Sequence, residues 1–234
     1  MKKNFITISS LFFLLLLISW TQQPKKENPY HLEIVSNMAD YQKSILSNSD
    51  NRLVDLEKVM NGIVLDIRYA TSNNFTHQTI YPAPKAFLRK PVTEALLKVQ
   101  QALKGKGIGL KVYDAYRPYA VTVKFFEVYP DTTFVASPKT GSKHNRGCAV
   151  DLTLIDSKSH NELEMPTAFD DFTEKAMHNY MNLSQKALQN RQILRDVMSK
   201  YGFIPYESEW WHYDFKGWKN YPIMDLSFEE LRNN

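Results

Sequence analysis

The chain has 234 residues, which suits one ordinary domain with extensions, and its 43% hydrophobic and 23% charged residues are typical of globular proteins. This composition excludes a largely disordered chain. The net charge of +4 includes Lys2 and Lys3 and is +2 without them, too low to indicate a nucleic-acid partner. Cys148 is the single cysteine, so an internal disulfide is excluded as well.

Residues 1–21 have the plan of a secretory signal peptide. Two lysines precede an apolar run over 5–18, and Ser19 and Thr21 are small enough to border a cleavage site. The run is too short for a comfortable membrane span, although an uncleaved anchor is the alternative. We therefore expect an exported protein, periplasmic or extracellular, without a stable membrane span after cleavage.

The remainder of the chain divides by composition. Residues 22–61 are mixed and polar, with a loop-like tract at 47–51, and are expected to form an arm and linker. Residues 62–234 are expected to form the main domain. Its strands are predicted from apolar side chains on one face or in short runs, over 62–69, 110–116, 148–155 and 210–215.

Helices are predicted where apolar residues recur at helical spacing. One begins at Pro91 and one at Pro118, and the longest covers 183–201 with Gly202 at its end. Strands and helices do not alternate as they do in βαβ units. We therefore expect an α+β fold with a central, mainly antiparallel sheet flanked by helices.

A histidine and an aspartate at the start of the 148–155 strand are candidate metal ligands. Asp151 projects from the strand, and His144 can approach it from the preceding loop, where Gly147 permits a close approach. A lone carboxylate in an apolar strand needs a partner, because a buried unpaired charge is costly.

A second cluster, Glu209-Trp210-Trp211-His212, supplies what the first one lacks. Two histidines and a carboxylate form a three-ligand zinc set with a fourth position open for water, and Glu209 could handle that water's protons. By strand alternation Trp210 would share a face with His212 and wall the site, whereas Trp211 would point into the core. The sequence therefore predicts a zinc hydrolase with one Zn²⁺ per chain.

Other reactive residues have plainer interpretations. Cys148 could be a fourth ligand or a nucleophile, but strand alternation turns it away from Asp151 and favours a buried, inert thiol. Arg117 follows the second strand and either forms a salt bridge with Asp114 or stabilises an oxyanion, and the local sequence favours neither. Four histidines lack partners at motif spacing and are expected to be surface or core residues: His31, His77, His160 and His178.

Taken together, these motifs resemble those of the zinc D-alanyl-D-alanine dipeptidases of the VanX type. The resemblance runs from about residue 62 to 215 and includes Glu209-Trp210-Trp211-His212-Tyr213 and Tyr116-Arg117-Pro118. The pattern Ser-x-His-x-x-Gly-x-Ala-x-Asp starts at Ser142 and ends at Asp151. Two further segments, 69–75 and 165–170, resemble substrate-contact segments of that family.

The resemblance implies a fold shared with the D,D-peptidases and the hedgehog signalling domain, and a role for each motif residue. Zinc would be bound by His144, Asp151 and His212, Glu209 would act as general base and acid, and Arg117 would stabilise the transition state. The dipeptide would be held by Tyr69, Ser142 and Asp170, with Asp170 on the ammonium group. Pro166 stands where the family usually has glycine, which affects the placing of Asp170.

The function implied is zinc-dependent hydrolysis of D-alanyl-D-alanine to two D-alanines, linked to cell-wall peptide turnover. Two alternatives stay open at this point. One is a D,D-carboxypeptidase that acts on peptidoglycan stem peptides, and the other is a non-catalytic, zinc-stabilised binding module. The export signal argues against a role in vancomycin resistance.

Overall fold

The structure, a computed structural model, describes residue 28 and residues 30–232. The signal peptide predicted for residues 1–21 lies outside the described residues. The strands are β1 (Ile34–Val35), β2 (Leu53–Asp55), β3 (Val64–Leu65), β4 (Phe87–Arg89), β5 (Ile108–Asp114), β6 (Ala149–Asp156), β7 (Phe203–Tyr206), β8 (Glu209–Phe215) and β9 (Ile223–Met224). The α-helices are α1 (Met38–Ser47), α2 (Leu56–Val59), α3 (Lys90–Lys104), α4 (Tyr119–Val128), α5 (Gln185–Lys200) and α6 (Phe228–Arg232).

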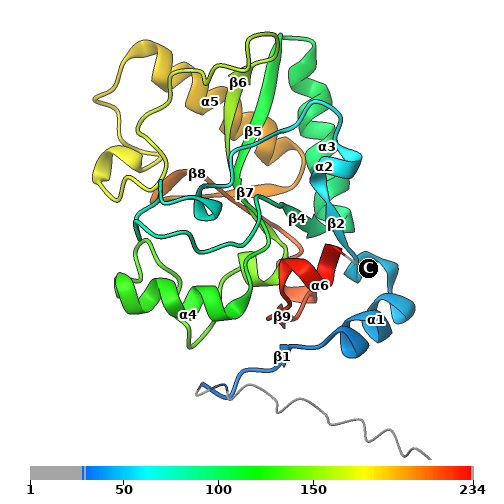
Figure 1. The fold of residues 1–234 in the computed structure, drawn as a ribbon. Helices are drawn as coiled ribbons and strands as arrows, with labels where there is room; N and C mark the ends of the chain where they lie inside the picture. Colours follow the sequence, from blue (N-terminus) through cyan, green and yellow to red (C-terminus); the bar gives the residue numbers. More distant parts are fainter. Residues whose placement is uncertain (1–27, 29, 233–234) are drawn as a thin grey trace, which may run out of the picture.

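The central sheet has the strand order β3-β5-β6-β8-β7 (Figure 1). Its β5–β6, β6–β8 and β7–β8 pairs are antiparallel, and β3–β5 is parallel. Two small sheets accompany it, an antiparallel β2–β4 pair and a parallel β1–β9 pair. The expected α+β fold with a mainly antiparallel sheet is confirmed.

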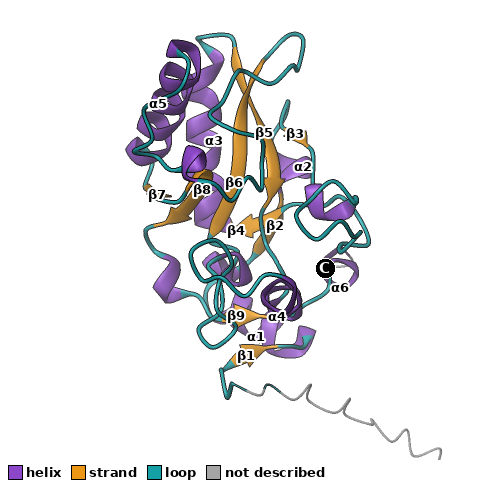
Figure 2. Cartoon of the chain, turned by 90° about the vertical axis from the view of Figure 1, so that its left-hand side faces the viewer, coloured by secondary structure: helices purple, strands orange, loops and turns teal. Residues whose placement is uncertain are grey.

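Helices α3 and α5 lie together on one side of the central sheet (Figure 2). The predicted helix at Pro91 is confirmed: proline occupies the first turn of α3, where its missing N–H costs nothing. Its apolar positions are buried, as 3.6-residue periodicity requires for a helix against a sheet. These buried positions are Val92, Ala95, Leu96, Val99 and Leu103.

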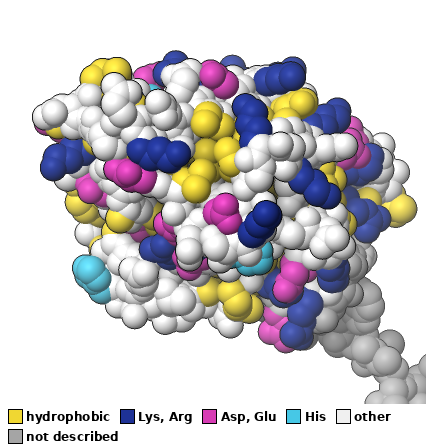
Figure 3. All heavy atoms as spheres, turned by 90° about the horizontal axis from the view of Figure 1, so that it is seen from above, with side chains coloured by type: hydrophobic (Ala, Val, Ile, Leu, Met, Phe, Trp, Pro, Cys, Tyr) yellow, Lys and Arg dark blue, Asp and Glu magenta, His cyan; other side chains and the backbone are white. Residues whose placement is uncertain are grey.

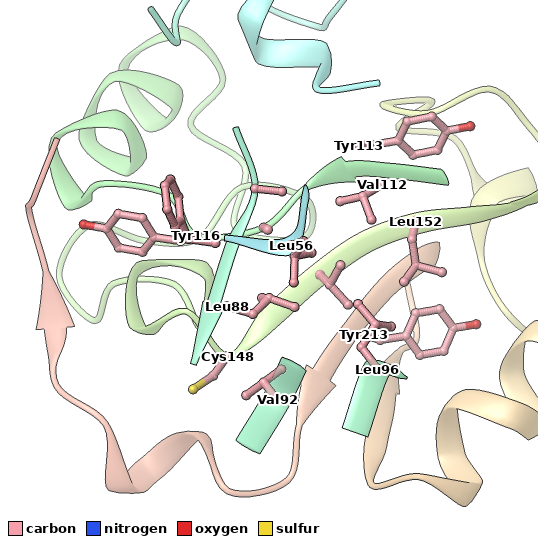
Figure 4. Close-up of a cluster of buried hydrophobic side chains, with 14 of the residues drawn as sticks. Leu56, Leu88, Val92, Leu96, Val112, Tyr113, Tyr116, Cys148, Leu152 and Tyr213 are labelled. Carbon is pink, nitrogen blue, oxygen red and sulfur yellow. The ribbon is translucent and has the colours of Figure 1, made fainter. Parts of the chain in front are cut away.

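Helix α5 is also close to its prediction. The hydroxyl of Ser184 caps its first turn by accepting from the N–H of Ala187, and Gly202 follows its end with a φ of +91°. Between these helices and the sheet lies a core that includes Leu96, Leu152 and Tyr213 (Figure 4). One face of the sheet is therefore devoted to packing, which leaves the other for the polar residues of β6 and β8.

One strand prediction is wrong in extent and another in its place in the chain. Only Val64 and Leu65 of the segment 62–69 are in a strand, because the chain turns into a 3-10 helix over Arg68–Ala70. The predicted last strand over 210–215 is confirmed as β8, but it is followed by β9.

The described part of the expected arm and linker, 22–61, instead belongs to the folded body. Tyr41, Leu56 and Met60 are almost fully buried, and the Tyr41 hydroxyl accepts a hydrogen bond from the N–H of Leu53 at 2.6 Å. Strand β2 also pairs with β4 of the main domain. The polar character of this segment reflects its exposed faces, while Tyr41, Leu53, Leu56 and Met60 join the core.

The surface shown in Figure 3 carries basic and acidic side chains side by side, with apolar atoms in small groups. That face therefore presents no field of a single sign. Within residues 28 and 30–232, no helix combines the length and apolar character that crossing a bilayer requires.

Candidate active site and metal centre

Strand register places three acidic and imidazole side chains in a row across the central sheet. Asp151 of β6 is the direct partner of Asp114 on β5 and of His212 on β8. Direct partners in neighbouring strands point to the same face. Leu152, the next residue of β6, points towards Leu96 of α3 (Figure 4), so Asp151 points to the opposite face.

His144 reaches this row from the loop before β6. It begins a 3-10 turn that ends at Gly147, whose φ of +66° lies in the left-handed region. A Cβ at Gly147 would come within 2.5 Å of Leu53 Cδ2, so the close approach that this glycine permits is to β2 and not to Asp151. Nδ1 of His144 lies 2.6 Å from the carbonyl oxygen of Ala115. A carbonyl only accepts, so Nδ1 carries the hydrogen and Nε2 is free to bind a metal.

The side chains of His144, Asp151 and His212 converge. Nε2 of His144 lies 3.2 Å from Nδ1 of His212 and 3.4 Å from Oδ1 of Asp151, and the last two atoms are 3.0 Å apart. Zinc ligands at 2.0–2.2 Å in a tetrahedron are about 3.3–3.6 Å apart, so these separations are close to what a zinc site needs. Oδ1 of Asp151 is buried and faces only the two ring nitrogens, so a cation between the three side chains would satisfy it.

The protonation of His212 and Asp151 depends on whether a cation is bound between them. Burial opposes charge on His212, but Asp214 and Asp151 together raise its pKa to about 10. Burial alone would raise the pKa of Asp151, yet the two histidines lower it below the usual value. Without a metal the pair is therefore ionic, and a bound cation would displace the proton of His212.

Glu209 opens β8 and lies beside the three candidate ligands. Its Oε2 is 3.7 Å from Nδ1 of His212. Burial raises the pKa of Glu209 to about 8, and the carboxylates of Asp151 and Asp170 add to the shift. A carboxyl group with a pKa near neutrality is suited to exchange protons with a reacting group.

The prediction for the two tryptophans is wrong. Trp211, not Trp210, lines the pocket beside His212, while Nε1 of Trp210 donates to the Thr167 hydroxyl at 2.9 Å. The pairing of β8 with β7 shifts register here, since Pro205 pairs with Tyr213 but Tyr206 pairs with Glu209. Regular strand alternation is therefore interrupted at the two tryptophans.

Arg117 combines both of the interpretations that its sequence left open. Its Nε and Nη2 donate to Oδ2 of Asp114 at 3.0 and 2.7 Å, and its guanidinium also lines the pocket. The guanidinium carbon lies 4.7 Å from the ring centroid of Phe125. Asp114 itself accepts from the Tyr81 hydroxyl at 2.9 Å. The cation is therefore held in one orientation at the pocket wall.

The three predicted substrate contacts also line this pocket. Asp170 accepts from the Tyr69 hydroxyl at 3.0 Å and from the N–H of Phe75 at 3.2 Å, and burial raises its pKa to about 7. Its φ of +62° is a conformation that aspartate adopts more readily than most residues. The Ser142 hydroxyl accepts from the N–H of His144 at 3.2 Å.

The pocket has a volume of about 260 Å³, below the roughly 300–1,000 Å³ typical of sites for drug-sized ligands. Sequence reasoning missed its aromatic wall, in which Phe172 packs against Phe75 and Phe134 with ring centroids 5.3 and 4.9 Å apart. It also missed Lys143 and Tyr206 in the lining. The wall comes from three loops, and no spacing in the sequence links them.

Residues given plainer interpretations lie away from the metal set. Cys148 is buried and points into the core (Figure 4), and burial raises the pKa of its thiol to about 12. His31, His77 and His160 are exposed, and His178 is buried behind β8 beside Tyr213. None of them shares in the His144–Asp151–His212 group.

Comparison with known proteins agrees with this arrangement. Residues 49–229 match the family model described as peptidase M15, D-ala-D-ala dipeptidase. The chain is 33% identical to the D-alanyl-D-alanine dipeptidase of Escherichia coli K12 over 176 residues, which cover 75% of this chain and 91% of that protein. It is 31% identical to the enzyme of that name from Enterococcus faecium, with 68% and 88% covered. The chain therefore belongs to the D-ala-D-ala dipeptidase family of peptidases.

Proposed function

We propose that this protein hydrolyses the dipeptide D-alanyl-D-alanine to two D-alanines with the help of one zinc ion. The observation that carries the proposal is the convergence of three donor atoms 3.0–3.4 Å apart in a pocket that also contains Glu209 and Arg117. The relatives named D-alanyl-D-alanine dipeptidase support the choice of substrate.

The donor set favours zinc. Two imidazole nitrogens and one carboxylate oxygen are ligands that zinc accepts, and three protein ligands are typical of catalytic zinc sites. His144, Asp151 and His212 would hold the ion. When bound, zinc supplies a water acidified to a pKa of about 7 and polarises the substrate carbonyl.

Glu209 acts as the proton carrier in this mechanism. Its carboxylate accepts the proton of the attacking water and then delivers it to the nitrogen of the leaving D-alanine. Arg117, oriented by Asp114, faces the oxyanion that develops as the carbonyl is attacked. Removing one such fixed electrostatic contact typically costs about 3 kcal/mol in the barrier.

Asp170, Tyr69 and Ser142 hold the dipeptide. An ionised Asp170 pairs with the free ammonium group of the dipeptide. Tyr69 and Phe75 hold the Asp170 carboxylate in place through two hydrogen bonds. This carboxylate favours a free dipeptide over a stem peptide, whose D-alanine nitrogen is acylated and uncharged. The D,D-carboxypeptidase alternative would need a more open cleft than this small pocket.

The decisive experiment combines metal analysis with a choice of substrates. The purified protein is expected to hold one zinc and to cleave D-alanyl-D-alanine, but to cleave the N-acetylated dipeptide far more slowly. Equal rates on both would indicate a carboxypeptidase. Zinc binding without any turnover would indicate a binding module.

We also propose that the protein acts outside the cytoplasm, in cell-wall peptide turnover. The charged start, apolar run and small residues within 1–21 support this location. Fractionation of cells and sequencing of the mature N-terminus test it. An uncleaved protein in the cytoplasmic fraction would contradict it.

A further inference from the structure

A chain of polar contacts leads away from the candidate metal centre through His212. Oδ1 of Asp214 lies 2.9 Å from Nε2 of His212. The other oxygen of that carboxylate, Oδ2, lies 3.3 Å from Nζ of Lys143. Asp214 and His212 are both buried, whereas the Lys143 side chain is 33% exposed.

The contact with Asp214 determines which nitrogen of His212 can bind a metal. A carboxylate only accepts hydrogen bonds, so Nε2 keeps its hydrogen, and once a cation has displaced the proton on Nδ1 that atom has the free lone pair. Nδ1 is the atom that faces Asp151 and His144. His144 is oriented in the opposite sense, by a backbone carbonyl at its Nδ1. The group that orients His212 is the Asp214 side chain, so it can be altered by substitution, whereas the backbone carbonyl that orients His144 cannot.

Lys143 connects Asp214 to the loop that carries His144. It directly precedes His144, and its ammonium group lies 5.8 Å from the ring centroid of Tyr206 and 5.6 Å from that of Trp218. The Lys143–Asp214 ion pair therefore links the loop that carries His144 to the strand that carries His212. Its partly buried position makes it stronger than a typical surface pair.

We propose that Asp214 and Lys143 are positioning residues of the metal centre. Asp214 fixes the ring orientation and tautomer of His212, and Lys143 holds Asp214 in place and thereby keeps the two ligand segments in register. The inference rests on the proposed zinc site. Asp214 does not line the pocket, and the ion pair with Asp214 lets Lys143 act through His212 as well.

Zinc affinity is the readout that distinguishes this role from a merely structural one. Dissociation constants are measured by competition with a chromophoric chelator, on the full-length protein as purified, with thermal unfolding of each metal-free variant alongside. Asp214→Asn is expected to bind zinc about 10–100-fold more weakly than the wild type. Lys143→Met is expected to bind zinc several-fold more weakly than the wild type. The double variant is expected to lose no more zinc affinity than Asp214→Asn alone.

Lys219→Met is the matched control. Its ammonium group lies 5.6 Å from the same Trp218 ring, but no contact links it to Asp214, so its zinc affinity is expected to be unchanged. Wild-type zinc affinity in Asp214→Asn would overturn the inference and leave the proposed function intact. If Asp214→Asn does not fold, a Lys143→Met variant that binds zinc as tightly as Lys219→Met overturns it. Absence of zinc binding by the wild type would instead refute the proposed function.

Discussion

Glu209 lies beside the three candidate ligands, with its Oε2 3.7 Å from Nδ1 of His212, and is not itself part of the ligand set. Glu209→Gln keeps the size of the side chain but cannot accept a proton. We expect turnover of D-alanyl-D-alanine to fall by about 10²–10⁴-fold while the zinc content stays at one per chain. Steady-state kinetics and metal analysis on the same sample check this. Near-normal turnover would remove Glu209 from the mechanism.

Asp170 provides a prediction on pH. Burial raises its pKa to about 7, so below this pH the carboxyl group is neutral and cannot pair with the substrate ammonium. We therefore expect kcat/KM to rise with pH through about 7, before the substrate amine itself loses its proton near pH 8.

Asp170→Asn is the control for that limb. Asparagine tolerates the left-handed backbone at this position and cannot ionise. The variant should have a lower kcat/KM, and its KM should no longer fall as pH rises through 7, while the pH dependence that Glu209 and a zinc-bound water give to kcat remains. If KM falls through pH 7 unchanged in Asp170→Asn, another group is responsible for it.

At the scale of elements, the turn at Gly147 sets how closely the loop that carries His144 packs against β2 and β4. Gly147→Ala places a Cβ 2.5 Å from Leu53 and forces an unfavourable positive φ. Gly62 has a similar φ of +82°, but nothing lies within 4 Å of the site of its Cβ. We expect Gly62→Ala to cost about 1 kcal/mol and Gly147→Ala about 2–4 kcal/mol of unfolding free energy.

Urea unfolding of the two glycine variants measures both costs. The difference between them isolates the steric contact, since the backbone strain is common to both. Equal losses would mean that Leu53 moves aside without cost and that the close approach is unimportant.

Elements were predictable where local periodicity and packing agree. Helix α3 has five buried apolar positions in one stripe and a proline at its start, so its sequence determines it. The segment 62–69 also alternates, but only two of its residues pair with β5, and the chain then turns. The prediction for Trp210 and Trp211 was wrong for a related reason, because β8 pairs with β6 only from His212 onwards. Pairing partners decide strand limits, and they are remote in sequence.

The candidate site was largely predictable because its residues occur in compact motifs, and the structure brings those motifs together. Its supports were not. Asp214 and Lys143 are ordinary charged residues in the sequence, and only the fold places His212 and Lys143 at the two oxygens of the Asp214 carboxylate. The same holds for Asp114, which orients Arg117 and is itself bound by Tyr81, a residue 33 positions earlier in the chain.

At the scale of the whole molecule, a buried neutral histidine connects stability to pH. Burial, and next the charges of Arg195 and Arg191, lower the pKa of His178 to about 4. The unfolded chain binds this proton below its ordinary value of 6.5, whereas the folded protein does not. The resulting contribution is fully present above pH 6.5 and is lost as pH falls towards 4, by about 3 kcal/mol in all.

His178→Phe keeps a ring beside Tyr213 and removes the titration. We expect the loss of unfolding free energy between pH 7 and pH 4.5 to be smaller in this variant by about 2–3 kcal/mol. Urea titrations at the two pH values measure it. Identical losses in both proteins would show that His178 is accessible to protons in the folded state.

Alternate residues of β6 serve two purposes: Val150 and Leu152 are buried in the core, while Asp151 faces the two histidines. A slip of one residue in the pairing of β6 would exchange these faces. Such a misfolded chain would place a carboxylate among the leucines and lose the candidate metal donors in a single error. At the proposed zinc site, metal binding would therefore report on the correct pairing of β6.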